Sequence, residues 1–299
     1  MQPRSRRVPG AHGLDLHGLE WSEEGVALLL LHGFGNDAHI WEDFAPAVVP
    51  YYRTLALDHR GHGDSAWDAE RRYEHDAMVA DVEAATAALG IERLVIVGHS
   101  LGGRIATIFA GRHPARMAGL VLVDIGPELD PRGILRIRME VESSQEPVFG
   151  SVEEYGRLLS LHYPAAQPKA LLRMAQHGLR RREDGRYVLK MDPALRGAGF
   201  AGSPEDAAER ERQMSEAQWD ALRRIACPAL VVRGAASDVF SAETADRMVD
   251  DVLAKGRLAV VPRAGHSVMT DNPEGFREAV AAFVLTEYET KPGGCPRRD

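Results

Sequence analysis

The stretch Leu94-Val-Ile-Val-Gly-His-Ser-Leu-Gly-Gly103 carries the strongest indication of the fold. Its apolar start predicts a buried strand, and the residues from Arg104 to Arg112 predict a helix directly after it. Between them, Gly98-His-Ser-Leu-Gly102 matches the pattern G-x-S-x-G, which in this context places a serine on a sharp turn. Glycines remove the Cβ atoms that would clash where the strand and helix approach. The pattern therefore predicts that Ser100 is a nucleophile.

Short apolar runs on both sides of this stretch predict further strands, at residues 27–31, 54–57, 120–123, 229–232 and 258–261. Each run is apolar on both faces, which is typical of a parallel strand covered by helices on both sides. Helical stretches separate the runs, as in 78–89, where apolar residues recur at helical spacing before Gly90. The alternation predicts an α/β fold with a doubly wound, mostly parallel sheet, and residues 14–21 are expected to add an antiparallel edge strand.

About a hundred residues between Val123 and Ala229 interrupt this alternation. Ser151-Val-Glu-Glu154 and Ser203-Pro-Glu-Asp206 are typical helix starts, and residues 187–190 predict a short strand after a turn. We therefore expect residues 127–225 to form an inserted helical lid on a core made of residues 9–126 and 226–290. Residues 1–8 and 291–299 are expected to be disordered tails.

Composition narrows the class of protein. The 299 residues allow one large domain or two modest ones, and 44 acidic against 36 basic residues argue against nucleic acid as a partner. The two cysteines, Cys227 and Cys295, provide neither a disulfide framework nor zinc-ligand spacing, and Cys227 is expected to be a small buried residue. The sequence has no signal-peptide pattern and no apolar run long enough to span a bilayer. We expect a cytoplasmic protein without a membrane partner.

A serine nucleophile needs a base, and the base needs a carboxylate that orients it. His266 is the candidate base, because it lies in the loop after the last predicted strand. Asp238, in the loop after strand 229–232, is the preferred acid. Asp124, at the end of strand 120–123, is the open alternative, since both carboxylates would lie at the carboxyl edge of the sheet.

Two backbone amides are candidates for holding an oxyanion. Gly33 lets the chain turn after strand 27–31 and leaves the Phe34 amide free, and the Leu101 amide lies at the start of the helix that follows Ser100. His32 is expected to have a structural role, bonding its ring to nearby backbone. His59 and His62 are expected to belong to a structured turn, and they lack a third partner that would make them metal ligands.

Together these motifs resemble the α/β-hydrolase superfamily, in its lid-bearing esterase, lactonase and carbon–carbon hydrolase branch. The resemblance covers residues 13–285 and rests on His32-Gly-Phe34, Asp58-His-Arg-Gly-His-Gly-Asp-Ser65, Gly98-His-Ser-Leu-Gly-Gly103, Gly234-Ala-Ala-Ser-Asp238 and Gly265-His266. It implies the order serine, aspartate, histidine along the chain, and a hydrolase that cleaves a carboxylic ester or lactone through an acyl-enzyme on Ser100. No metal or organic cofactor is required.

The same residues leave several activities open. A carbon–carbon bond hydrolase or a perhydrolase would use the same triad, and a small-molecule receptor can share the fold. Ser100 itself argues against haloalkane dehalogenases and epoxide hydrolases, which resemble this chain but have aspartate at the corresponding position.

Overall fold

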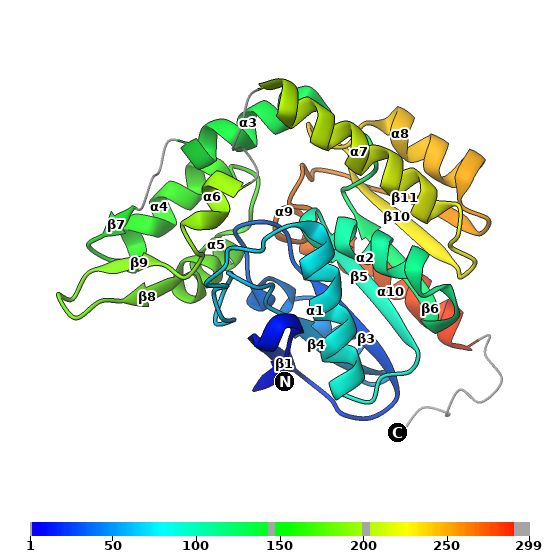
Figure 1. Ribbon diagram of the computed structural model, residues 1–299, viewed down its shortest axis with the longest axis horizontal. Coiled ribbons are helices and arrows are strands. Elements are labelled where there is room, and N and C mark those ends of the chain that lie inside the picture. The colour runs from blue at the N-terminus through cyan, green and yellow to red at the C-terminus, as the bar shows by residue number, and fades with distance from the viewer. Residues whose placement is uncertain (1, 143–146, 199–203, 290–299) are drawn as a thin grey trace.

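The structure, a computed structural model, describes residues 2–142, 147–198 and 204–289 and has an eight-stranded sheet at its centre (Figure 1). The strand order is β1-β2-β4-β3-β5-β6-β10-β11. Neighbouring strands from β4 to β11 pair in parallel, and β2 pairs antiparallel with both β1 and β4. The predicted α/β fold with a mostly parallel sheet is confirmed. The strands are β1 (Arg4–Pro9), β2 (Asp15–Glu20), β3 (Val26–Leu31), β4 (Tyr52–Leu57), β5 (Leu94–His99), β6 (Met117–Val123), β10 (Ala229–Gly234) and β11 (Gly256–Val261).

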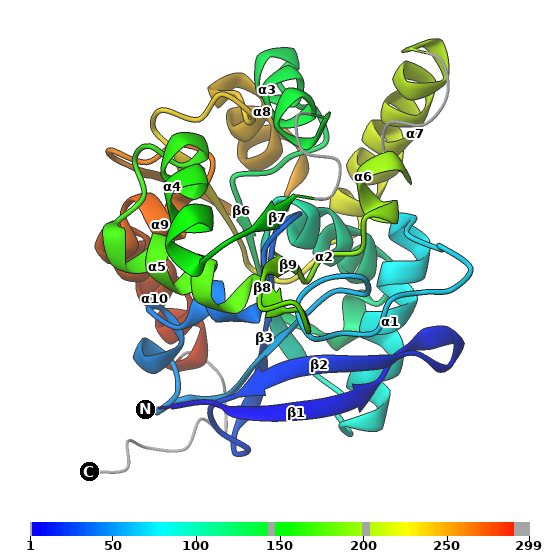
Figure 2. The same ribbon diagram turned by 90° about the vertical axis from the view of Figure 1, so that its left-hand side faces the viewer.

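Helices cover both faces of the sheet, which explains why its strands are apolar on both sides. On one face, α1 (His75–Ala88), α2 (Leu101–Arg112), α7 (Pro204–Leu222) and α8 (Ala242–Arg247) contribute to a core that includes Leu29 and Leu31. On the other face, η2 (Ala38–Trp41) and α10 (Pro273–Glu289) pack over Leu28 and Leu30. Figure 2 shows α1 and α10 on opposite sides of the strands.

The N-terminal segment differs from the expectation. Residues 1–8 are predicted to be a disordered tail, but Arg4–Pro9 forms β1 and pairs with β2. Val8 is buried, and the side chains of Arg4 and Arg6 both contact the Glu20 carboxylate, at 2.9 and 2.5 Å. Strand pairing and these ion pairs hold a segment whose own sequence is too polar to indicate a strand. The predicted strand at 14–21 is therefore not at the edge of the sheet.

The segment between β6 and β10 is mainly helical, as predicted. It also contains a small sheet in the order β7-β9-β8, and Tyr187–Leu189 is the predicted short strand. Ser151 caps α4 by accepting a hydrogen bond from the Glu154 amide at 3.2 Å. The other predicted cap, Ser203, lies outside the described residues. The elements are α3 (Pro131–Glu142), β7 (Val148–Phe149), α4 (Val152–His162), α5 (Pro168–His177), β8 (Leu179–Arg181), β9 (Tyr187–Leu189), α6 (Ala194–Ala198) and α7.

The last helix of this segment, α7, packs on α2 of the core. The Gln218 side chain donates a hydrogen bond to the Arg104 carbonyl at 3.0 Å, and Ala221 lies against Gly111. The inserted segment is therefore anchored to the helix that begins immediately after Ser100.

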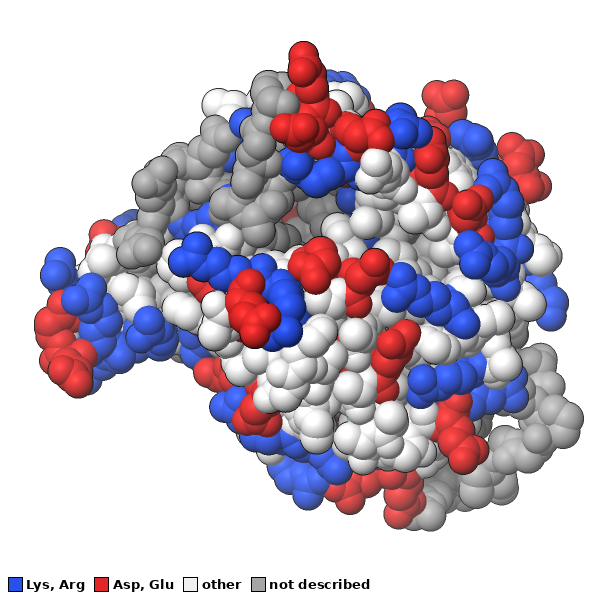
Figure 3. All heavy atoms as spheres, in the orientation of Figure 1, with Lys and Arg blue, Asp and Glu red and all other residues white. Residues whose placement is uncertain are grey.

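Acidic and basic side chains are interspersed over much of the face seen in Figure 3. Over the described ranges, no helix has both the length and the apolar character needed to cross a bilayer. Cys227 is buried, as expected, whereas residues 291–299 with Cys295 lie outside the described part of the chain. The cytoplasmic location stays a prediction.

Candidate active site

Ser100 lies on the sharp turn between β5 and α2. Its backbone is in an unusual conformation, with φ of 51° and ψ of −117°. A Cβ atom added to Gly98 would lie 2.5 Å from the Gly102 carbonyl oxygen, and one added to Gly102 would lie 2.4 Å from the Leu31 carbonyl oxygen. Both glycines are therefore required by close backbone approaches, as the pattern predicts.

The base candidate lies against this serine. His266, in the loop between β11 and α9 (Val268–Asp271), places its Nε2 3.1 Å from Ser100 Oγ. The His266 carbonyl oxygen accepts a hydrogen bond from His99 Nε2 at 2.9 Å. Burial lowers the pKa of His99 to about 3, so its ring stays neutral. His99, the residue before Ser100 in the G-x-S-x-G pattern, thus ties the strand that leads to Ser100 to the loop that carries His266, a role that the sequence did not indicate.

Asp124, and not Asp238, contacts the histidine. Asp124 Oδ2 lies 2.9 Å from His266 Nδ1. The same carboxylate accepts hydrogen bonds from Ser237 Oγ at 2.5 Å and from the Gly234 amide at 2.8 Å, and its side chain is 0% exposed. Asp124 follows β6 with a φ of 50°, which turns its side chain toward the histidine loop.

The expectation that Asp238 orients His266 is therefore wrong. Asp238 is 39% exposed, and its carboxylate accepts hydrogen bonds from Arg136 Nε at 2.7 Å and from Arg136 Nη2 at 2.9 Å. The Arg136 guanidinium holds the pKa of Asp238 below its ordinary value despite partial burial. Ser237, the residue before it, faces the site instead, so Asp238 links the β10 loop to α3 of the inserted segment.

The two oxyanion candidates border the serine. A Cβ atom added to Gly33 would lie 2.7 Å from His99 Nδ1 and 3.1 Å from Ser100 Cβ, so the loop that carries Phe34 passes directly over the turn. Across the described residues, neither the Phe34 amide nor the Leu101 amide donates to a protein acceptor. Both amides are thus available to a ligand beside Ser100.

Ser100 and His266 open into a cavity of about 680 Å³. Most of its apolar wall comes from the inserted segment, and its polar lining comes from several elements. The apolar residues include Phe149, Tyr155, Leu158, Leu159, Leu161 and Tyr163, and the polar ones include Asn36, Asp37, Arg136, Lys190, Arg196 and Asp238. A cavity of this size and lining suits a small organic molecule.

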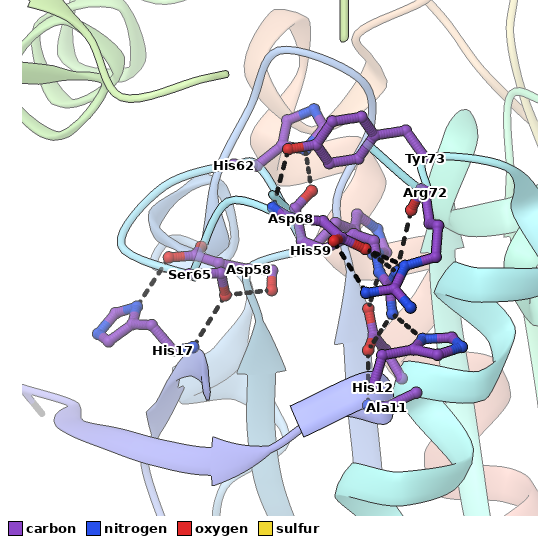
Figure 4. Close-up of polar contacts among 12 residues, drawn as sticks. Ala11, His12, His17, Asp58, His59, His62, Ser65, Asp68, Arg72 and Tyr73 are labelled. Carbon is purple, nitrogen blue, oxygen red and sulfur yellow. Dashed lines mark hydrogen bonds and ion pairs between the residues drawn. The ribbon is translucent and has the colours of Figure 1, made fainter. Parts of the chain in front are cut away.

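His32, His59 and His62, which precede Ser100, have structural roles, as expected. His32 Nε2 accepts a hydrogen bond from the His59 amide at 3.0 Å, and His32 Nδ1 donates to the Gly33 carbonyl at 2.8 Å. Burial lowers the pKa of His59 to about 3 and that of His62 to about 4. Figure 4 shows His59 and His62 within the polar network of this turn. The network holds the turn beside the Phe34 loop without placing a second base at Ser100.

Elsewhere in the described part of the chain, two groups of side chains have metal-ligand composition. In the first, His39, Glu42 and His177, the two imidazole rings stack with centroids 3.4 Å apart and an angle of 14° between their planes. Their lone pairs lie in nearly parallel planes and do not converge on one point. In the second, His17 Nδ1 is already hydrogen-bonded to Asp58 at 2.7 Å, beside Asp64. The expectation of no metal stays a prediction.

The Asp37 side chain in the cavity wall makes the stability of the fold depend on pH, and a variant at this position can reveal that dependence. Burial, and secondly the nearby Asp58 carboxylate, raise the pKa of Asp37 to about 7. An unfolded chain loses this proton near pH 4, so raising the pH from 5 to 8 removes stability through this group. Asp37→Asn stays neutral and can still accept from the His39 amide, a 2.9 Å hydrogen bond.

We expect Asp37→Asn to have a higher Tm than the wild type. The gain in Tm is expected to be larger at pH 8 than at pH 5 by a few degrees. Thermal unfolding followed by circular dichroism at both pH values measures the difference. The exposed Asp246→Asn serves as the control and is expected to give the same small change at both. A Tm difference between Asp37→Asn and the wild type that does not change with pH would contradict a raised pKa of Asp37.

Residues 26–273 match the family model described as alpha/beta hydrolase fold. The chain therefore belongs to the alpha/beta hydrolase family, and it is an enzyme of the hydrolase class.

Similar proteins support this placement. Esterase Rv0045c of Mycobacterium tuberculosis is 28% identical over 274 residues, covering 90% of this chain and 86% of that protein. The 3-hydroxybutyrate-oligomer hydrolase of Cupriavidus necator is 30% identical over 293 residues, covering 92% of this chain and 94% of that protein. A crystal structure of an alpha/beta hydrolase from Novosphingobium aromaticivorans is similar with a TM-score of 0.79 and 30% identity, covering 96% of this chain and 99% of that one.

Proposed function

We propose that this enzyme hydrolyses a carboxylic ester or lactone through an acyl-enzyme on Ser100. The observation that carries the proposal is the continuous chain of contacts from Asp124 to His266 at 2.9 Å and from His266 to Ser100 at 3.1 Å, at the floor of a cavity. Serine, histidine and aspartate in this arrangement are the groups that acyl transfer to water requires.

In the proposed mechanism, Ser100 Oγ attacks the substrate carbonyl while His266 Nε2 takes the hydroxyl proton. Asp124 accepts the Nδ1 proton of His266, which fixes the tautomer and stabilises the imidazolium that forms. The Phe34 and Leu101 amides hold the oxyanion, each contributing about 3 kcal/mol if they act as donors in related mechanisms do. His266 then protonates the leaving alcohol and activates the water that releases the acid.

The cavity lining supports an ester whose acyl or alcohol part is apolar and of moderate size. Leu158, Leu159 and Phe149 provide apolar surface, and Asn36 and Lys190 provide polar groups at the wall. The name of the esterase relative supports an ester in preference to a carbon–carbon bond. Lactones remain within the proposal because they are cyclic esters and react through the same tetrahedral intermediate.

A turnover assay tests this function against the receptor alternative. We expect multiple turnovers with at least one member of a panel of p-nitrophenyl esters and lactones, preceded by a burst of about one product per active site if deacylation limits the rate. Intact-protein mass spectrometry during the burst is expected to find one acyl group per chain. Product release that stops at one equivalent across the whole panel would favour a receptor.

We further propose that residues 127–225 act as a lid over the site, because their side chains form most of the apolar wall of the cavity. The exposed Leu135 and Met139 on α3 indicate an element with few apolar contacts. Amide exchange is therefore expected to be faster in α3 than in β5, whose residues are buried on both faces. Equal protection of α3 and β5 in hydrogen-exchange mass spectrometry would contradict a mobile lid.

A further inference from the structure

A second chain of hydrogen bonds that joins a serine, a histidine and an aspartate lies on the N-terminal side of the sheet. Ser5 Oγ on β1 is 2.9 Å from His17 Nε2 on β2, and His17 Nδ1 is 2.7 Å from Asp58 Oδ2. The corresponding distances at Ser100 are 3.1 and 2.9 Å. The two hydrogen-bond chains therefore have the same order of groups and similar hydrogen-bond lengths, although they share no residue.

The protonation states follow from the hydrogen bonds around Asp58. Burial opposes its ionisation, but the His17 ring and the backbone amides of Ala38 and Asp64 hold the pKa of Asp58 below its ordinary value. An ionised carboxylate can only accept, so His17 Nδ1 must carry the proton that it shares with Asp58. His17 Nε2 is then the acceptor, and the Ser5 hydroxyl donates to it. Figure 4 shows His17 beside Asp58 and Ser65.

Along this hydrogen-bond chain the histidine and the aspartate are buried while the serine is exposed, as a reactive serine requires. His17 is 4% exposed and Asp58 is 1% exposed, so water competes little for their hydrogen bond. Ser5, by contrast, is exposed on the edge strand, where a reagent in solution can reach its hydroxyl. Strands β2, β4 and β3 separate β1 from the strand that leads to Ser100, so the two serines are independent.

We propose that Ser5 is a second nucleophile that accepts acyl groups from activated esters, with His17 as its base and Asp58 as a positioning residue. Ser5 Oγ forms a bond to the ester carbonyl carbon, and the hydroxyl proton passes to His17 Nε2. The bond from that carbon to the leaving oxygen breaks, and the leaving oxygen takes the proton from His17. The products are an O-acyl-Ser5 and the free alcohol or phenol.

The Ser100→Ala variant makes the test independent of the proposed hydrolase activity. It is incubated with p-nitrophenyl acetate, and acetylation is followed by mass spectrometry of the digested protein. Ser160 is the internal control, because it is also exposed but its hydroxyl donates to the Arg157 carbonyl instead of a histidine. General-base assistance typically gives 10²–10⁴-fold, so Ser5 is expected to be acetylated at least about 100-fold faster than Ser160.

Two further variants complete the test. Ser5→Ala in the Ser100→Ala background removes the adduct from the N-terminal peptide and leaves acetylation of Ser160 unchanged. His17→Gln, with cooperative unfolding verified by a thermal melt, lowers the acetylation rate of Ser5 to that of Ser160. Equal rates for Ser5 and Ser160 in the Ser100→Ala protein overturn the proposal, whatever the stability of the His17 variant. A folded His17→Gln protein that still acetylates Ser5 rapidly overturns it as well.

Discussion

Ser100→Ala is expected to lower kcat for a good ester by about 10⁶, the size of effect known when a serine hydrolase loses its nucleophile. The reason is that Ser100 Oγ is the hydroxyl that lies against His266 Nε2, at 3.1 Å, and alanine has no group to replace it. The Tm is expected to stay within a few degrees of the wild type, because among the described residues the only Ser100 side-chain hydrogen bond lost is the one to His266. Steady-state kinetics with a p-nitrophenyl ester and a thermal melt measure both quantities.

A control substitution separates loss of chemistry from loss of structure. Ser160→Ala changes an exposed serine whose hydroxyl donates to the Arg157 carbonyl of its own helix, and it is expected to keep the wild-type kcat. Ester turnover that persists in folded Ser100→Ala at more than about a hundredth of the wild-type rate would assign the hydrolysis to another group.

The second large effect distinguishes the two aspartates. Asp124→Asn is expected to lower kcat by about 10⁴, since an amide cannot stabilise the imidazolium and favours the wrong tautomer of His266. Asp238→Asn is expected to keep kcat within about tenfold, since it loses only a half-exposed pairing with Arg136, of a kind that usually contributes little. The ester kinetics of both variants, measured at a temperature where each is folded by circular dichroism, make the comparison.

The reverse result for the two aspartate variants would contradict this prediction. If Asp238→Asn were inactive while Asp124→Asn kept its kcat, the carboxylate that contacts His266 in the structure would not be the one that supports catalysis. The Asp124 variant also loses one acceptor for either the Gly234 amide or Ser237, so a fall in Tm is expected for it and does not by itself explain a loss of activity.

The positions of Ser100 and His266, the candidate nucleophile and base, were predictable from the sequence because their constraints are local. Glycine is required at positions 98 and 102 because a Cβ atom there would clash with the backbone of Gly102 and of Leu31, which is on the neighbouring strand β3. His266 follows a strand with a clear apolar pattern. The parallel sheet was predictable for the same reason, since a strand that is covered on both faces is apolar at successive positions.

The acid was not predictable because both candidates satisfy the same rules. Asp124 and Asp238 both lie between Ser100 and His266 in the chain, and each follows one of two strands, β6 and β10, that pair in parallel. The choice depends on the φ of 50° at Asp124 and on Ser237 pointing inward, neither of which leaves a pattern in the sequence. The strand β1 was missed because its partner, and not its composition, stabilises it.

The adjacency of β5 and β6 has a consequence for engineering this enzyme. His99 pairs with Val123, and the Ser100 amide donates to the Val123 carbonyl at 3.2 Å, so one hydrogen-bonded register sets the spacing between Ser100 and Asp124. Exchanging α3 to α6 for the equivalent segment of another enzyme would alter the walls that meet the substrate and leave that register intact. New substrate ranges can therefore be sought by exchanging this segment as a unit, while the proposed catalytic residues Ser100 and Asp124 keep their positions at the ends of β5 and β6.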